Sequence, residues 1–208
     1  MELEARTCAD DMIREWVRAE IDSPAWGPYY VSAGLSREDA HAPLDDGAAC
    51  RRREHGLAEV RGWPNVKWMF ENFPATTEWW RAEVDAGEPL LLMSYDLFHA
   101  ATYNSRRPED FAPDRVGIEE RIRSIDAQLG QRKVQEYLGK VTTIEELAKT
   151  IDETGRDVAP IIVVARDEAG PLVIMEGHTR VLARTKHPPR SQPAILGLSP
   201  NMGDWKWY

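Results

Sequence analysis

Five consecutive residues toward the C-terminal end of the chain combine the side chains that acid–base and anion-binding chemistry require. Residues 176–180, Glu-Gly-His-Thr-Arg, follow the apolar run 172–175 and precede a segment with helical apolar spacing at Val181 and Leu182. A strand, a tight turn and a helix in this order bring backbone N–H groups and the positive end of a helix dipole to one point. The pattern therefore predicts an anion-binding or active site at this turn.

Each residue of the turn has a chemical role available to it. Gly177 allows close approach of the backbone to a ligand, and Thr179 supplies a hydroxyl group and an N–H group. Arg180 offers two parallel donors to a phosphate. His178 is suited to donating a hydrogen bond to a phosphate oxygen or to shuttling a proton near neutral pH. Glu176 is suited to acting as a general base or as a ligand of Mg²⁺.

A structural role is open to the same side chains. Glu176 and His178 are also suited to capping the following helix, and Arg180 is suited to pairing with Glu176 or with Asp167. The convergence of a glycine, a histidine, a threonine and an arginine on one helix start beside an acid favours a functional site.

The residues around the turn predict the elements that hold it in place. Thr143 and Glu146 form a capping box, with Thr143 as N-cap, for a helix that ends near Gly155. The helix of the turn is expected from His178 to Lys186. Apolar runs bounded by turn residues predict three strands in this part of the chain: 159–165, 172–175 and 194–198.

The first 87 residues are predicted to be mainly helical and rich in tryptophan. Helical apolar spacing indicates a helix over 9–22, and Thr76 or Thr77 is expected to cap a second helix that ends near Gly87. The arginine run 51–53 is interpreted as a solvated helix face. Most of the eight tryptophans are expected to pack in the core or to line a groove.

A buried strand is predicted over 89–94, and three basic residues that follow it are candidates for binding a second substrate: His99, Arg106 and Arg107. The alternative for these residues is a structural histidine and a solvated turn. Amphipathic patterns predict either two helices, over 116–129 and 132–138, or one helix that is kinked at Gly130.

Charge and cysteine content limit the classes of partner. The net charge of −9 and the pI of about 5.1 argue against a nucleic-acid-binding surface, which needs clustered Lys and Arg. Residues 159–208 instead carry six Lys and Arg residues against four Asp and Glu residues, which favours a small anionic ligand. Cys8 and Cys50 match neither a disulfide nor a metal pattern, and no apolar run approaches the length of a membrane helix. These features predict a cytoplasmic protein with no membrane partner.

The ordered set of elements resembles the ParB/sulfiredoxin-like fold. Three stretches between Ile144 and Leu182 carry the resemblance: Glu-Glu-Leu-Ala-Lys-Thr-Ile-Asp-Glu-Thr-Gly, Pro-Ile-Ile-Val-Val and Glu-Gly-His-Thr-Arg-Val-Leu-Ala. The resemblance implies an α+β fold, with a small mixed sheet and packed helices in a nucleotide- or phosphate-binding domain over 88–208. Residues 1–87 would form the Trp-rich, mainly helical extension.

The resemblance also implies what the turn binds: phosphates of a nucleotide, contacted by Gly177, His178, Thr179 and Arg180. Members that phosphorylate free serine are similar at this motif, which reads acid, Gly, His, His and Arg. Glu176 takes the acidic position here, and Thr179 replaces the second histidine. Sulfiredoxins carry a cysteine where this chain has His178, so sulfinic acid reduction is not expected.

The expected activity is nucleotide-dependent phosphoryl transfer to a hydroxyl group of a small metabolite, with Mg²⁺ and ATP or ADP as cofactors. Two alternatives stay open: a non-catalytic nucleotide-binding or sensing module, and a nucleotide hydrolase or nuclease on the same fold. The expected partners are a nucleotide and a small metabolite, nucleic acid is not expected, and a homo-oligomer stays open.

Overall fold

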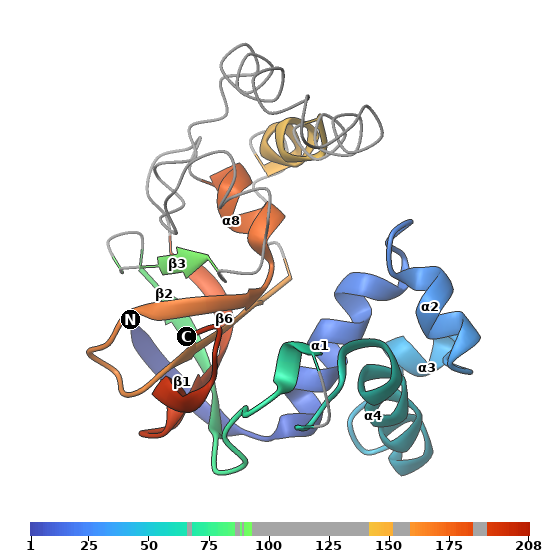
Figure 1. Cartoon of the computed structure of the whole chain (residues 1–208). Helices are drawn as coiled ribbons and strands as arrows, with labels where there is room; N and C mark the ends of the chain where they lie inside the picture. The colour runs from blue at the N-terminus through green and yellow to red at the C-terminus, as the bar shows by residue number, and fades with distance from the viewer. Residues whose placement is uncertain (66–67, 86–87, 89, 93–141, 152–158, 185–190) are drawn as a thin grey trace, which may run out of the picture.

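The computed structural model describes residues 1–65, 68–85, 88, 90–92, 142–151, 159–184 and 191–208. Within these residues a mixed six-stranded sheet has the order β1-β2-β6-β4-β5-β3 (Figure 1). The strands are β1 (Glu2–Thr7), β2 (Glu78–Val84), β3 (Leu90–Leu92), β4 (Ile161–Ala165), β5 (Leu172–Glu176) and β6 (Gln192–Leu198).

Helices precede, interrupt and follow these strands along the chain. The N-terminal helices are α1 (Ala9–Ile21), α2 (Gly27–Ser32), α3 (Arg37–His41) and α4 (Gly47–Arg61). The short 3-10 turns are η1 (Trp68–Phe70) and η3 (Met202–Asp204). A helix over 142–151 and α8 (His178–Arg184) complete the described set, and none of the described helices is long and apolar enough to cross a membrane. The mixed α and β architecture expected from the sequence is confirmed.

The sheet joins segments that are far apart in the sequence. β1 pairs with β2 and β2 with β6, both antiparallel, so two strands from the first 87 residues extend the sheet formed by β3–β6. β4 pairs antiparallel with β5 in a hairpin, whereas β4 with β6 and β3 with β5 are parallel. The region 1–87 is therefore continuous with the sheet that carries the turn at 176–180.

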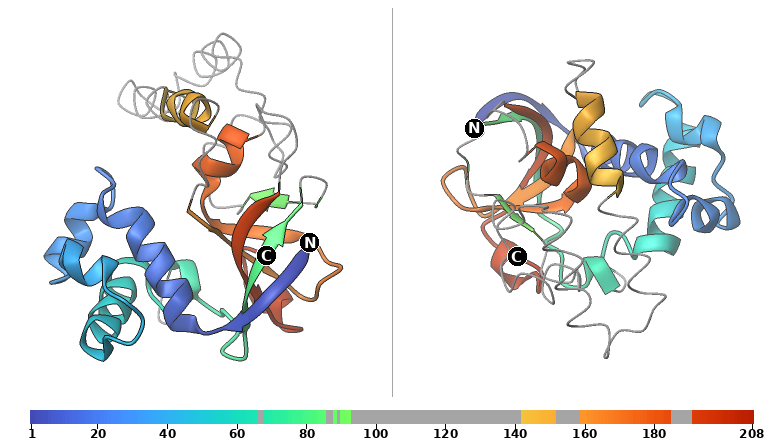
Figure 2. Two further views of the ribbon diagram at one scale, coloured as in Figure 1. Left: turned by 180° about the vertical axis from the view of Figure 1, so that it is seen from behind. Right: turned by 90° about the horizontal axis from the view of Figure 1, so that it is seen from above.

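Alternation along the strands divides the core between the two faces of the sheet. Ile162 and Val164 of β4 belong to the hydrophobic cluster that also contains α1, α4 and most of the aromatic side chains. Ile161, Val163 and Ala165 belong to a second, mainly aliphatic cluster with α8 and the helix over 142–151. The views in Figure 2 show α1–α4 gathered on one side of the molecule, apart from α8 and the helix over 142–151.

The aromatic side chains fill the first of these two clusters. Phe73 packs edge-on against Trp205, with ring centroids 5.3 Å apart, and the Trp205 indole N–H donates to the Met69 carbonyl at 2.8 Å. Trp16 lies 5.4 Å from Phe70 between ring centroids and is fully buried. These contacts confirm a core role for the tryptophans involved, and they explain the C-terminal aromatic residues as part of the same core.

Local signals account for the ends of two N-terminal helices. Ser36 and Asp39 form a capping box at α3, and the Asp46 carboxylate accepts from the N–H groups at the start of α4. α4 ends at Arg61 and is capped by Gly62, whose φ of 86° lies in the left-handed region that glycine adopts without strain.

Several predicted elements are confirmed. The described structure has a helix at 9–21, strands at 90–92, 161–165, 172–176 and 192–198, and the helix that begins at His178. The predicted helices within 116–138 lie outside the described residues, as do the candidates His99, Arg106 and Arg107.

Two predictions are wrong, and a third holds only in part. The helix expected from Thr76 or Thr77 is the strand β2, because backbone pairing with β1 and β6 on both sides overrides the local capping signals. Thr143 is not an N-cap, since it lies within the helix over 142–151. The arginine run is exposed at Arg51 and Arg52, as predicted, but Arg53 is 1% exposed and donates to the carbonyl groups of Asp39 and Ala42 at 2.8 and 3.0 Å.

Candidate active site

The turn between β5 and α8 depends on Gly177. Its φ is 100°, a left-handed conformation that residues with a Cβ atom rarely adopt. A Cβ atom added to Gly177 would lie 2.7 Å from Cγ2 of Ile161 and 3.1 Å from Nη2 of Arg180. Both the backbone angle and the close packing therefore require glycine, which brings the end of β5 and the start of α8 together.

Arg180 ties the turn to the start of β4. Its Nη1 donates to the carbonyl oxygens of Ala159 and Pro160 at 3.1 and 3.0 Å, and its Nη2 donates to Oε1 of Glu176 at 3.2 Å. The side chain is 12% exposed. The pairing with Glu176, which the sequence left open as a structural alternative, is thus present. The guanidinium group of Arg180 links the end of β5 and the start of α8 to the residues that precede β4.

Glu176 is an acid that changes charge near neutral pH. Burial raises the pKa of its carboxyl group to about 7, and the negative charge of Glu20 adds to the increase. The charges of Arg180 and Arg61 and a hydrogen bond from the Gly177 N–H act in the opposite direction. Because the side chain keeps 21% of its surface exposed, a substrate proton could reach it. A carboxyl group with this pKa is suited to general acid–base catalysis.

His178 and Thr179 lie where the sequence predicts, in the first turn of α8, and both are half-buried. With Glu176, Gly177 and Arg180 they form one contiguous turn, so the structure brings the five predicted residues together. Among the described residues no group of three or more His, Cys, Asp or Glu side chains is arranged to hold a metal ion. Glu176 is the residue of this turn that could supply a carboxylate ligand to Mg²⁺.

Two buried charged residues outside the turn affect the pKa of Glu176, and the sequence did not predict them. Glu20 of α1 and Arg61 of α4 form a buried ion pair, and both charges affect the pKa of Glu176. The one available signal was an acid on the apolar stripe of α1, four residues after Trp16. Nothing local in the sequence indicates that this acid pairs with Arg61.

Comparison with protein-family models, with curated proteins and with solved structures finds no match to this chain.

Proposed function

We propose that the chain is a nucleotide-dependent phosphotransferase that acts on a hydroxyl group of a small metabolite, with the turn 176–180 as its active site. One observation carries the proposal. Glu176, a partly exposed carboxyl group with a pKa of about 7, stands beside the cationic Arg180 at the turn that leads into α8. Phosphoryl transfer to a hydroxyl group needs a base that is ionised near neutral pH and a cation near the phosphates.

In the proposed reaction the acceptor oxygen attacks the terminal phosphorus of the nucleotide, and the hydroxyl proton passes to the Glu176 carboxylate. The new phosphorus–oxygen bond forms as the bond to the bridging oxygen breaks, and the shortened nucleotide leaves with that electron pair. Arg180 and the backbone N–H groups of the turn stabilise the phosphate charge, and His178 donates to a phosphate oxygen. Mg²⁺, when bound, would neutralise the phosphates, and a Glu176 carboxylate ligating it is the alternative to the base role.

The order of the helices and strands around the turn supports this proposal. A helix over 142–151, the β4–β5 hairpin, the turn and α8 follow one another as the resemblance to ParB/sulfiredoxin-like proteins implies. A cytoplasmic location is part of the proposal, because nucleotides and Mg²⁺ are available there and the free thiols of Cys8 and Cys50 stay reduced. His99, Arg106 and Arg107 remain the candidates for holding the acceptor.

A second candidate function, a non-catalytic nucleotide-binding module, is favoured by the contacts of Arg180. Three hydrogen bonds to Ala159, Pro160 and Glu176 already engage both terminal nitrogens of its guanidinium group. A side chain used in this way stabilises the turn, and the phosphates would then rest on the backbone alone. The two candidates differ in one outcome, since a binding module protects the fold without consuming nucleotide.

A thermal-shift screen of ATP, ADP, CTP, GTP and inorganic phosphate, with and without Mg²⁺, tests both candidates. We expect a nucleotide to raise the melting temperature. Binding at a hundredfold excess over the Kd adds about 3 kcal/mol to the free energy of unfolding. Glu176→Gln should keep this shift, because the amide preserves the size of the side chain. The absence of any shift across the screen would contradict both candidates.

A further inference from the structure

An open groove lies at the end of the sheet opposite to the turn 176–180. Its volume is about 540 Å³, which is within the range of small-molecule sites. β4 runs from the turn towards the groove. Near the start of β4, Ile162 pairs with Glu176, and at its other end the Ala165 carbonyl accepts from the Ser199 N–H at 3.1 Å. Ser199 begins the loop that forms one side of the groove, so the groove and the turn are separate.

Two loops form the groove, and contacts between them fix its shape. One loop leads from η1 to β2, and the other follows β6 and includes η3. The edge-on contact of Phe73 with Trp205 and the hydrogen bond from Trp205 to the Met69 carbonyl join the two loops in the core. At the surface, Nζ of Lys206 lies 3.0 Å from Oε2 of Glu71. A groove held in this way is preorganised, so a ligand loses little affinity to the ordering of its walls.

Hydrogen bonds within the first loop fix the backbone on both sides of Phe73. The Asn72 N–H donates to Oδ1 of Asn65 at 2.8 Å, which joins two positions seven residues apart. The hydroxyl group and the N–H group of Thr77 both donate to the Pro74 carbonyl, at 2.7 and 3.3 Å. The bond from Asn72 engages the amide oxygen of Asn65 and leaves the N–H donors of this amide to other partners.

The polar side chains of the groove are neutral or acidic, and all of them are exposed: Asn65, Asn72, Thr76, Asn201 and Asp204. Each carboxamide group donates and accepts at neighbouring atoms, and the Asp204 carboxylate accepts only. The described residues that line the groove include no Lys, Arg or His. This set matches hydroxyl groups, which also donate and accept. It does not match a phosphate, whose recognition favours cationic donors.

The groove also has apolar surface, supplied by Phe73, Pro74 and Ala75. Such surface favours contact with C–H groups. A saccharide ring presents C–H groups on its faces and hydroxyl groups along its edge, so it matches both parts of the lining. An extended peptide would need the free backbone edge of a strand. The strands that adjoin the groove, β2 and β6, are each paired on both sides, so a peptide is disfavoured.

We propose that this groove binds a neutral saccharide, at a site separate from the turn 176–180. Asp204 and the asparagine side chains bind the hydroxyl groups of the ligand, and Pro74 and Ala75 contact the C–H groups of its ring. The inference does not depend on the proposed phosphotransferase activity, because the two sites lie at opposite ends of the sheet and take ligands of different charge.

Saturation-transfer difference NMR of the full chain with neutral mono- and disaccharides tests for binding. The panel contains glucose, galactose, mannose, N-acetylglucosamine, maltose and lactose. Because the polar side chains of the groove are exposed, a saccharide must displace the water that hydrates them, and we expect a Kd in the millimolar range. Saturation transfer to at least one saccharide is the expected result. The absence of transfer to every member of the panel would overturn the inference.

Two variants locate the bound saccharide. Asp204→Ala removes a charged acceptor, and Ala75→Trp fills the groove from an exposed position. Each should weaken binding at least about tenfold. The two substitutions change the groove in different ways, so the test stands on the second variant if the first does not fold. Unchanged affinity in the folded variants would overturn the assignment of the site.

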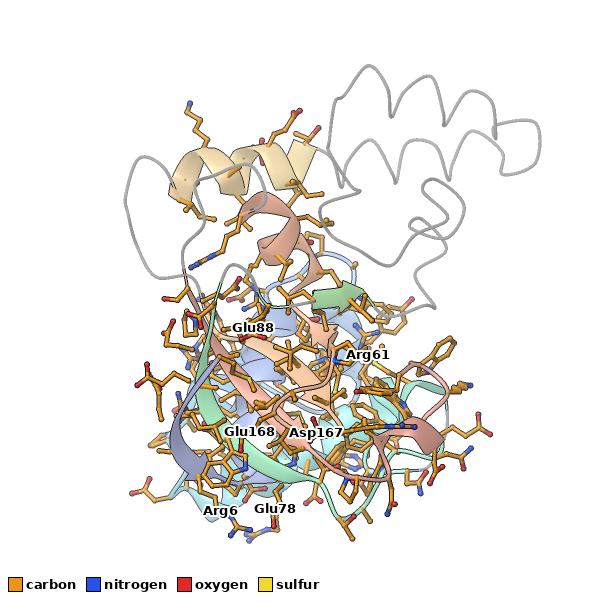
Figure 3. All side chains as sticks on the ribbon, turned by 90° about the vertical axis from the view of Figure 1, so that its left-hand side faces the viewer. Arg6, Arg61, Glu78, Glu88, Asp167 and Glu168 are labelled. Atoms are coloured by element: carbon orange, nitrogen blue, oxygen red, sulfur yellow. The ribbon has the colours of Figure 1, made fainter. Side chains whose placement is uncertain are left out.

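The matched control is Glu78→Ala. Glu78 is an acid two residues after Thr76, is 55% exposed, and pairs with Arg6 instead of lining the groove. Figure 3 shows Arg6 and Glu78 together at the outer edge of the molecule. This variant should bind the saccharide as the wild type does. A loss of binding equal to that of Asp204→Ala would show that the groove is not the site.

Thermal shifts separate this inference from the proposed function. The shift that a nucleotide causes should be the same in Asp204→Ala as in the wild type, because the groove and the turn are separate. If Asp204→Ala also removed the nucleotide shift, the two ligands would share one site and the inference would be overturned. Saccharide binding without any nucleotide shift in the wild type would contradict the proposed function and leave the saccharide site established.

Discussion

The two faces of the central sheet receive alternate residues of the same strands, yet they bury side chains of different kinds. The face that packs against α8 and the helix over 142–151 is mainly aliphatic. The opposite face packs against aromatic rings and against α1 and α4, which together supply the buried charged residues of the described structure: Asp11, Glu15, Glu20, Arg53 and Arg61. The aliphatic face packs against the turn through Ile161, whereas the helical face carries two charged residues, Glu20 and Arg61, that shift the pKa of Glu176 in opposite directions.

The largest expected effect comes from breaking the buried pair on the helical face. Arg61→Met leaves Glu20 buried without its cation and should lower the free energy of unfolding by about 3–5 kcal/mol, measured in urea. Adding Glu20→Gln should restore most of that loss. Leu182→Ala on the aliphatic face should cost about 2–5 kcal/mol through a cavity. If the second substitution restores nothing, the charges on the helical face do not act as a pair.

The stability of the turn at Gly177 is expected to be sensitive to one added methyl group. Gly177→Ala combines a φ of 100° with a contact of 2.7 Å to Ile161, and should lower stability by about 2–4 kcal/mol. Gly34→Ala is the control, because its φ of 84° carries the backbone strain while nothing lies within 4 Å of the added carbon. It should cost about 1 kcal/mol. Equal losses at the two positions would show that the close packing at Gly177 is unimportant.

The charge on Glu176 links stability to pH. Its folded pKa of about 7 lies above the ordinary value of 4.5, so the native state holds this proton more tightly than the unfolded state does. This contribution to stability is complete below pH 4.5 and is lost as the pH rises to about 7. Glu176→Gln should therefore gain roughly 3 kcal/mol relative to the wild type above pH 7, and little below pH 4.5. A gain that does not vary with pH would contradict the raised pKa.

The smallest expected effect concerns the surface. Glu78→Gln breaks the exposed contact of 3.1 Å with Arg6 and should change stability by less than about 1 kcal/mol. The measurement is urea unfolding at low and high salt. A loss comparable to that of Arg61→Met would mean that burial does not distinguish the two pairs.

The aliphatic face could be predicted from the sequence, whereas of the helical face only α1 and the core role of the tryptophans could be predicted. β4, β5 and the start of α8 follow from apolar runs and turn residues that lie next to one another in the chain. β2 was mistaken for a helix because Thr76, Thr77 and Gly87 resemble helix caps. Its true partners, β1 and β6, pair with it at sequence separations of 72–81 and 108–120 residues.

The candidate site also contains one part that the sequence predicts and one part that it does not. Glu176 to Arg180 are consecutive, so their convergence at one turn was readable from the sequence. Glu20 and Arg61 are separated by 41 residues and lie far from the turn in the chain, so only the folded structure brings their charges to bear on Glu176. The contacts of Arg180 with Ala159 and Pro160 were missed for the same reason, since no local pattern indicates a side chain that reaches backbone carbonyl groups.

Phosphorus NMR of ATP and Mg²⁺ incubated with the protein and a pool of hydroxyl-bearing metabolites tests the central claim most directly. The account predicts conversion of ATP to ADP with a new phosphate-ester signal, an acidic limb near pH 7, and a rate that falls at least about a hundredfold in Glu176→Gln. An unchanged ATP spectrum, or equal rates for the wild type and Glu176→Gln, would contradict the assignment of Glu176 as the base of a phosphotransferase.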